Sequence, residues 1–411
     1  MEVHDAMRML ALLATAVLLT SSARAAEPAP NAQPAPRSLD EAVNWLRKEA
    51  HRIIRASERK MKDGTAAFPP QVGIGYEAFW LRDYGYTLEG SIGSYSDKEL
   101  IAACNLFVGG ISPDGAGLDC IKFDGTLIYK PGGGRMGENP VADGPQFTVG
   151  VAFHAFQRTR DTRHLASIIE PLIKTMNAAP RNEQTGLVHI KPGGWDRCPY
   201  GFTDTIRKQG DVLFCSLLYV QASRQLSQLL TALDRKKDAE HWQAQAEAVS
   251  QSIRKVFWNE KVGLFDAATV QCRQPDIWGS AFAVYLDVAS AAQAKAVAAY
   301  FKEHYAEIVQ EGQIRHLPGG QYWEAGCRKD TYQNGGYWAT PTGWFVYTLD
   351  LAAPKLADQT VIDMVTSFQR HGACEWILGQ THHLPNYLAS AALPLDGIDA
   401  MIRRRLKNNS K

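Results

Sequence analysis

The sequence has little of several features that mark common functional classes. Its charge is balanced, with 44 Lys and Arg against 43 Asp and Glu, so the basic footprint of a nucleic-acid-binding protein is missing. Basic residues gather only at 403–407, which we interpret as a short solvated tail. No apolar run reaches the roughly twenty residues that span a bilayer. We therefore expect neither a nucleic-acid partner nor a membrane partner.

Metal ribbons, phosphate loops and parallel sheets are equally unsupported. The seven cysteines are scattered without a C-x-x-C pair, which excludes zinc ribbons and thioredoxin-like motifs. The glycine-rich stretch at 132–137 lacks a following G-K-[ST], so it is better interpreted as a flexible pocket rim than as a phosphate loop. Alternating Val, Ile and Thr runs are short and few, which disfavours a parallel sheet.

The N-terminal residues have the pattern of an export signal. Arg8 precedes an apolar run at 9–19, and an A-R-A site ends at Ala25. A run of this length is typical of a cleaved signal peptide rather than of a membrane span. We predict a signal peptide at residues 1–25, a Pro/Ala-rich linker at 26–37 and a single domain at 38–411. The mature protein would then be periplasmic or secreted.

Helical periodicity runs through most of the remaining sequence. A Ser-x-x-Glu capping box at 38–41 opens the first helix. The other predicted helices follow Asp83 and cover about 97–108, 144–159, 163–178, 211–231, 236–257, 276–286, 290–307, 337–352, 358–369 and 384–393. Roughly twelve helices, joined by long loops and without an internal repeat, predict one large all-α domain.

The loops between these helices carry unusual chemistry. Six of the ten tryptophans lie in or beside them, at positions 80, 195, 323, 338, 344 and 376. Aromatic faces stack on the C–H faces of a pyranose, and charged groups form strong hydrogen bonds to its hydroxyls. The pattern therefore indicates a sugar pocket.

Three loop segments hold the candidate site residues. Arg82 and Asp83 lie between aromatic residues, where they would clamp sugar hydroxyls or form a structural ion pair. Asp196 follows a Gly-Gly-Trp turn, and desolvation by Trp195 would raise its pKa and suit it to act as a general acid. Glu375 is a lone carboxylate flanked by Trp376 near the last predicted helix.

The order of these segments resembles the six-hairpin glycosidases, which include trehalases, mannosylglycerate hydrolases and alkaline/neutral invertases. The matching segments are WLRDY at 80–84, PVADGP at 140–145, WDR at 195–197, FWNE at 257–260, YQNGGYW at 332–338, and Glu375 at the place of the family's general base. The sequence departs from the family at Cys198, Cys374 and Trp376, and at the LPNY segment 384–387, where the family has F-x-W-T. The resemblance covers about residues 70–395.

The resemblance implies an (α/α)6 toroid that hydrolyses a small saccharide with inversion. In this pattern Asp196 is the general acid and Glu375 the general base, about 6.5–9.5 Å apart. The resemblance further implies a terminal sugar held by Arg82 and Asp83. The remaining predicted substrate contacts are Trp80, Trp195 and Trp338 as stacking walls, Asn334 as an amide contact, and Asp143, Arg197 and Trp376. No cofactor and no metal are expected.

Several alternatives stay open at this point. Asp204 competes with Asp196 for the acid role, and Glu324 competes with Glu375 for the base role, while Asp143 is also a candidate helix N-cap. His382 and His383, with His371 nearby, suggest a metal site, but adjacent histidines on a loop point in different directions and the H-E-x-x-H spacing is absent.

Two other classes of function also compete. A polysaccharide lyase or sugar epimerase on a similar toroid would use Tyr332, His316 and Arg315 instead of paired carboxylates. A sugar-binding protein without activity is the third possibility. The sugar, its linkage and the oligomeric state are left open.

Overall fold

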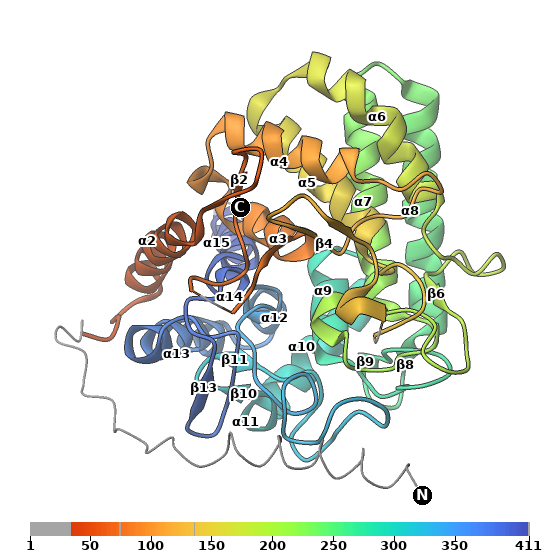
Figure 1. Cartoon of the computed structure of the whole chain (residues 1–411). Helices are drawn as coiled ribbons and strands as arrows, with labels where there is room; N and C mark the ends of the chain where they lie inside the picture. Colours follow the sequence, from red (N-terminus) through yellow and green to blue (C-terminus); the bar gives the residue numbers. More distant parts are fainter. Residues whose placement is uncertain (1–33, 74, 135, 410–411) are drawn as a thin grey trace, which may run out of the picture. The chain divides into compact units, whose positions relative to one another are not determined.

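Two concentric rings of helices form the body of the protein, seen in the computed structural model in Figure 1. The structure describes residues 34–73, 75–134 and 136–409, so the predicted signal peptide and most of the predicted linker lie outside the described residues. The described residues from Ala35 onward form one compact unit. The all-α fold expected from the sequence is confirmed.

The helices of the inner ring are α3 (Leu81–Ser91), α5 (Gly144–Thr159), α7 (Leu213–Ala232), α9 (Ile277–Tyr285), α12 (Thr342–Leu349), α14 (Leu388–Ala392) and α15 (Pro394–Asn409). They contact one another in chain order up to α12, which contacts α15, and α15 in turn contacts α14. Both α14 and α15 contact α3, which closes the ring. Inner helices are buried nearly all round, as in α9, where every residue from Ile277 to Val284 is buried.

The outer ring packs against the inner one and is amphipathic. Its members are α2 (Leu39–Ser57), α4 (Asp97–Gly109), α6 (Thr162–Asn177), α8 (Lys236–Val256), α10 (Ala291–Glu303) and α13 (Pro354–His371), with the short α11 (Tyr305–Ile308) after α10. In α2 the buried face carries Leu46, Ala50 and Ile53 at helical spacing. Ser38 caps this helix by accepting from the Glu41 backbone N–H. The Glu41 carboxylate accepts from the Arg37 N–H, so only half of the predicted capping box forms.

Short antiparallel strands lie in the loops between the helices. They pair as β1 (Arg59–Lys60) with β2 (Ala66–Ala67), β3 (Ala78–Trp80) with β4 (Cys120–Lys122) and β5 (Leu127–Ile128), β6 (His189–Ile190) with β7 (Gly210–Asp211), β8 (Trp258–Asn259) with β9 (Leu264–Phe265), β10 (Val309–Gln310) with β11 (Gln313–Ile314), and β12 (Trp376–Leu378) with β13 (Thr381–His383). Three single 3₁₀ turns cover Ile92–Ser94, Pro131–Gly134 and Gly201–Thr203. The β3–β4–β5 sheet and the β12–β13 hairpin position residues of the site described below.

The C-terminal helix α15 corrects one prediction. The basic residues at 403–407 were expected to form a solvated tail, but they continue a helix of the inner ring. Its buried stripe is Leu395, Ile398 and Met401, a spacing of three residues that favours a helix. Arg404 and Arg405 both pair with Asp350, so part of the basic cluster fixes α15 to the end of α12.

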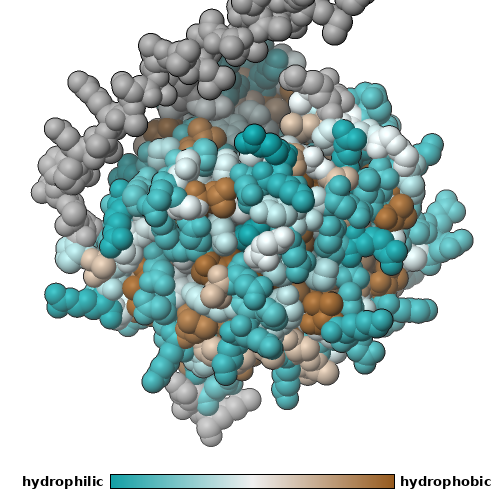
Figure 2. Space-filling view, turned by 90° about the horizontal axis from the view of Figure 1, so that it is seen from below, coloured by the Kyte–Doolittle hydropathy of each residue, from teal (hydrophilic) through white to brown (hydrophobic). Residues whose placement is uncertain are grey.

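The cysteines and the surface bear on two further expectations. All seven cysteines are free, and Cys198 and Cys374 are buried as small apolar side chains. Among the described helices, none is long and apolar enough to cross a membrane. The face seen from below is mostly hydrophilic, with small and separate hydrophobic patches (Figure 2).

Candidate active site

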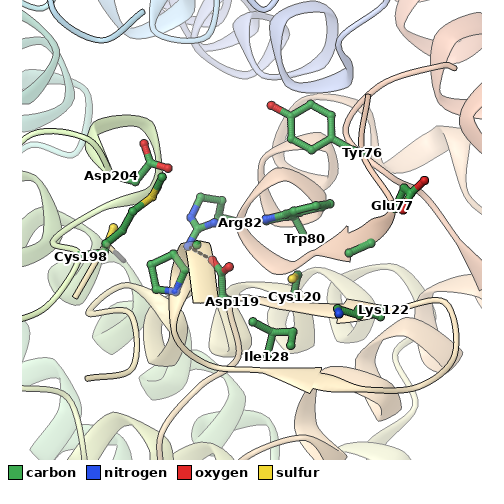
Figure 3. A pocket seen from close by; sticks show the side chains of 14 residues that line it. Tyr76, Glu77, Trp80, Arg82, Asp119, Cys120, Lys122, Ile128, Cys198 and Asp204 are labelled. Carbon is green, nitrogen blue, oxygen red and sulfur yellow. Dashed lines mark hydrogen bonds and ion pairs between the residues drawn. The ribbon is translucent and has the colours of Figure 1, made fainter. Parts of the chain in front are cut away.

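A cavity of about 420 Å³ lies beside the β3–β4–β5 sheet. This volume lies within the range of small-molecule sites. Figure 3 shows Asp204 and Cys198 on one side of it, Tyr76, Glu77 and Trp80 on the other, and Arg82 between them. The lining residues are Tyr76, Glu77, Ala78, Trp80, Arg82, Asp119, Cys120, Lys122, Ile128, Pro131, Gly132, Met136, Cys198 and Asp204. The rim predicted at 132–137 thus contributes Gly132 and Met136.

Arg82 lines the cavity from the first turn of α3, which follows β3 directly. Its guanidinium forms ion pairs with two carboxylates, Asp119 (Nη2–Oδ1 2.8 Å) and Asp143 (Nε–Oδ2 2.9 Å). The backbone N–H of Gly201 donates to the same Asp143 oxygen (3.1 Å). A Cβ at Gly201 would lie 1.8 Å from the Arg82 Cδ, so this close approach requires glycine.

We expect Arg82→Met to destabilise the protein strongly. The substitution leaves Asp119 and Asp143 buried without their cation, and breaking a buried ion pair in this way costs about 3–5 kcal/mol. Urea unfolding followed by circular dichroism measures the loss. The matched control is Arg47→Met, which removes an exposed pair with Asp399 and should cost about 0–1 kcal/mol. Equal losses in the two variants would contradict the assignment of Arg82 to a buried structural network.

Glu375 is held by tyrosines immediately before β12. It is 1% exposed, and its Oε1 accepts hydrogen bonds from the hydroxyls of Tyr76 (2.7 Å) and Tyr332 (3.2 Å). Burial raises the pKa of Glu375 to about 7, although the two hydroxyls act in the opposite direction. Glu375 is not among the cavity-lining residues, but Tyr76, which donates to it, lines the cavity.

Asp204 lies on the cavity wall, just after the 3₁₀ turn Gly201–Thr203. Its Oδ1 accepts from the side-chain amide of Gln333 at 2.5 Å. The Gln333 orientation is fixed because its Oε1 accepts from both the N–H and the hydroxyl of Thr205. Desolvation raises the pKa of Asp204 to about 6.

A third buried carboxylate, Asp83, completes the group. It is 4% exposed and accepts a hydrogen bond from the Tyr387 hydroxyl. Burial raises the pKa of Asp83 to about 6. The charges of Asp83 and Asp204 both raise the pKa of Glu375, so the three carboxylates act on one another.

The same turn positions two of these carboxylates. Tyr332 donates to Glu375, and the next residue, Gln333, donates to Asp204. The donors on all three carboxylates are neutral hydroxyl or amide groups, and Arg82 is already engaged by Asp119 and Asp143. Each of the three carboxyl groups has a raised pKa, so each can gain or lose a proton near neutral pH. Acid–base catalysis needs groups of this kind.

Comparison with known proteins bears on the fold and the class of enzyme. The family model of the bacterial alpha-L-rhamnosidase six-hairpin glycosidase domain matches residues 130–317. The fold is similar to a GH63 mannosylglycerate hydrolase from Thermus thermophilus, with a TM-score of 0.61 and 16% identity, over 85% of this chain and 99% of that chain. The chain has the fold of the six-hairpin glycosidase superfamily. The predicted (α/α)6 toroid and the predicted class of glycoside hydrolase are confirmed at this level.

A second similar structure is larger than this glycosidase. The GH78 rhamnosidase of Bacillus sp. GL1 is similar with a TM-score of 0.58 and 15% identity, over 89% of this chain and 36% of that chain. The glycosidase therefore spans about a third of that rhamnosidase. No curated protein sequence matches the chain.

The predicted acid segment of the glycosidase lies outside the cavity lining. Asp196 is half-buried, and its Oδ1 accepts from the Asn139 amide (3.0 Å). The Trp195 ring lies under the Arg207 guanidinium at 4.6 Å, and Arg197 donates to the Pro140 carbonyl (2.7 Å). The segment thus packs against residues 138–140, next to the rim.

Three predicted substrate contacts have structural roles instead. Asp143 occupies the N-cap position of α5, as the alternative predicted, but its fully buried carboxylate pairs with Arg82 and makes no side-chain cap or sugar contact. Both ends of the Asn334 amide are used inside their loop, by the Trp323 N–H and the Cys327 carbonyl. Trp338 is 0% exposed and packs behind Tyr332. These corrections share one cause, because a residue type and its spacing do not reveal which way a side chain faces.

The remaining predicted site residues differ in whether they line the cavity. Trp80 lines the cavity, while Trp376 is half-buried and stacks on His383 at 3.7 Å. Glu324 is exposed and accepts from the Cys272 N–H, which removes it from the base role.

The lyase candidates are used elsewhere in the fold. His316 is buried and stacked on Trp278 at 3.7 Å. Arg315 donates to the Gln321 carbonyl and lies over two tyrosine rings. Only Tyr332 contacts the carboxylate group, through Glu375, so the structure does not support lyase chemistry.

The donors that hold the carboxylates are not evident from the sequence. Tyr76, Gln333 and Tyr387 were given no role, although the last two stand in or beside segments compared with the family. Tyr76 stands in no such segment. The role of Tyr76 becomes evident only in the folded protein, where the loop before β3 brings its hydroxyl to Glu375, just before β12.

Proposed function

We propose that this glycosidase is an exported, exo-acting, inverting glycoside hydrolase that acts on a small saccharide with an α-linked sugar of gluco or manno type. The observation that carries the proposal is the pairing of Asp204 and Glu375 through consecutive residues of one turn. Inverting enzymes need two carboxyl groups on opposite sides of the scissile bond, with room for water between them.

In the proposed mechanism Asp204 is the general acid and Glu375 the general base. Asp204 gives its proton to the glycosidic oxygen as the bond to the anomeric carbon breaks, so the leaving group departs as an alcohol. Glu375 takes a proton from a water whose oxygen forms the new bond on the opposite face. Asp204 ends deprotonated and Glu375 protonated, and proton exchange with solvent restores both.

Burial raises the pKa of both carboxyl groups, with the higher value on Glu375, so the productive state with Asp204 protonated and Glu375 ionised is the minor form of the singly protonated pair. Burial raises the pKa of Asp204 to about 6, so a useful fraction keeps the proton that an acid must donate. Burial raises the pKa of Glu375 to about 7, so it is a stronger base than an exposed carboxylate while remaining ionised in part at neutral pH.

The cavity supports a small sugar as substrate. Trp80 and Tyr76 present aromatic surfaces edge to face with ring centroids 5.0 Å apart, and such surfaces bind pyranose C–H groups. The similar mannosylglycerate hydrolase was solved in complex with glucose and, separately, with Tris and D-glycerate. These ligands support a hexose in the cavity and a small polar leaving group.

The N-terminal sequence supports export. Residues 1–25 have the charge, the apolar run and the small-residue site of a cleaved signal. We propose that residues 38–411 act in the periplasm or the medium.

Proton NMR tests the proposed reaction class directly. The protein is mixed with trehalose, sucrose, glucosylglycerate, mannosylglycerate and α-linked oligomers, and the anomeric signals are followed from the first minutes. We expect one sugar to be cleaved with early appearance of the β-anomer from an α-linked substrate. Early appearance of the α-anomer would contradict inversion, and line-broadening without cleavage would indicate a sugar-binding protein without activity.

The pH dependence of kcat/KM gives a second test. Glu375 must be ionised, so activity is lost as the pH falls, and Asp204 must be protonated, so activity is lost as the pH rises. With pKa values of about 7 and about 6, the pair carries one proton mainly between these values, and the profile belongs to the pair. We expect a bell with its maximum between pH 6 and pH 7. A plateau that extends to pH 9 would contradict an acid at Asp204.

A further inference from the structure

A second cluster of polar side chains lies outside the cavity. Glu311, His371 and His382 each offer one ligand atom, and these atoms lie within 4.8 Å of one another. None of the three lines the cavity. His371 is exposed and the other two are half-buried, so the cluster is open to solvent.

Three separate segments meet at this cluster. Glu311 lies in the turn between β10 and β11, with a positive φ of 49°. His371 is the last residue of α13, and His382 lies in the middle of β13. In sequence Glu311 is 71 residues from His382, so the spacing of the histidines alone does not reveal it.

The hydrogen bonds of His382 orient it for a ligand. Its Nδ1 is 3.2 Å from the Gln380 carbonyl oxygen, which only accepts, so Nδ1 carries the proton. In a neutral ring Nε2 then presents its lone pair to the Glu311 Oε2, another acceptor, at 3.2 Å. Two acceptors facing each other need a positive centre between them. A histidine that donates its other ring N–H to a carbonyl is the usual arrangement of a metal ligand.

His371 and Ser367 complete the arrangement. The His371 ring stacks on His382 with centroids 3.7 Å apart, which brings a second imidazole to the carboxylate. The Ser367 hydroxyl donates to the Glu311 Oε2, a contact that fixes the carboxylate. A second proton on His382 would satisfy the His382–Glu311 pair alone, whereas a metal ion also uses His371.

We propose that Glu311, His371 and His382 bind a divalent transition metal ion of the Zn²⁺ type. Two imidazole nitrogens and one carboxylate oxygen suit Zn²⁺, with a water molecule as the fourth ligand. No metal is expected from the sequence, in which His382 and His383 stand as the pair. The structure separates them, since His383 stacks on Trp376.

The ion would brace the segment that carries the general base. The backbone N–H of Glu375 donates to the His383 carbonyl at 3.0 Å, next to His382 in β13. A metal ion at the cluster ties this hairpin to α13 and to the β10–β11 turn. Its role is structural, so it is separate from the proposed hydrolysis and is tested without substrate.

Isothermal titration of the full chain with Zn²⁺ tests the site. We expect one equivalent to bind to the metal-free protein. Removing partners that merely orient ligands costs roughly 10- to 100-fold in affinity, so His371→Ala, His382→Ala and Glu311→Gln should each lose at least 10-fold. The matched control is His383→Ala, which removes a neighbouring histidine outside the cluster and should leave affinity unchanged.

Two further measurements distinguish this site from binding of metal at the cysteines and from loss of folding. Co²⁺ in place of Zn²⁺ should give visible d–d bands without the intense near-ultraviolet band of a thiolate ligand, which separates this site from the free cysteines. Zn²⁺ should raise the Tm of the wild type by mass action but not that of His382→Ala, whose metal-free Tm reports its folding. Absence of stoichiometric binding to the wild type, a thiolate band, or an equal loss in His383→Ala would overturn the proposal.

Discussion

Glu375→Gln is expected to lower kcat by about 100- to 10,000-fold, the usual contribution of a general base. The substitution keeps the shape of the side chain and an acceptor for Tyr76 and Tyr332, but it removes the group that takes the proton from water. Binding of the sugar should change little because the water, rather than the sugar, loses its partner. Steady-state kinetics on the substrate identified by NMR measure both effects.

The matched control for this variant is Glu324→Gln. Glu324 is exposed and its carboxylate accepts from a backbone N–H, so kcat should be unchanged. A normal Tm for Glu375→Gln excludes unfolding as the cause of its loss. Full activity in Glu375→Gln would remove the base assignment and with it the proposed mechanism.

Asp204→Asn is expected to slow hydrolysis of natural saccharides by a similar factor, about 100- to 10,000-fold. The amide cannot protonate the leaving oxygen. A substrate with a leaving group that needs no proton, such as a dinitrophenyl glycoside, should therefore recover most of the lost rate. A residue that only supports the fold would slow both kinds of substrate equally, so the ratio of the two rates decides the role.

Asp196→Asn is the decisive comparison. Asp196 accepts from Asn139 and does not line the cavity, so we expect it to keep most of the activity and the bell-shaped pH profile. The opposite result, in which Asp196→Asn shows the leaving-group dependence and Asp204→Asn does not, would return the acid role to the residue that the family resemblance favours.

Much of the fold could be predicted because a helix shows its apolar periodicity within a short stretch of sequence. The stretch predicted at 144–159 coincides with α5 (Gly144–Thr159), and the stretch at 236–257 with α8 (Lys236–Val256). Helix α15 was missed because its buried positions lie among arginines, whose partners Asp350 and Asp358 are distant in sequence. Charge composition alone suggested solvent there, whereas tertiary ion pairs decided the outcome.

The candidate site could be predicted less completely. The order of motifs along the chain indicated Glu375, Trp80 and Asp83, and the structure places all three in or next to the cavity. Asn334 and Trp338 stand in the most distinctive motif, yet they serve the loop and the core. Some residues of such a motif stabilise the turn and the core, while others contact the substrate.

The choice between Asp196 and Asp204 shows why distances are required. Both lie on one loop, eight positions apart in the sequence, and both have aromatic neighbours. Only the packing of the 331–334 turn against the loop reveals that Gln333 reaches Asp204. No local pattern carries that information, because the partner is 129 residues away.

The closure of the inner ring has a consequence for how the protein is made. Helix α2, near the start of the chain, packs against α13, α14 and α15 at its end. The first outer helix can therefore form these contacts only after the C-terminal helices have been synthesised. We therefore expect ring closure, which joins the two ends of the described chain, to be a late step of folding.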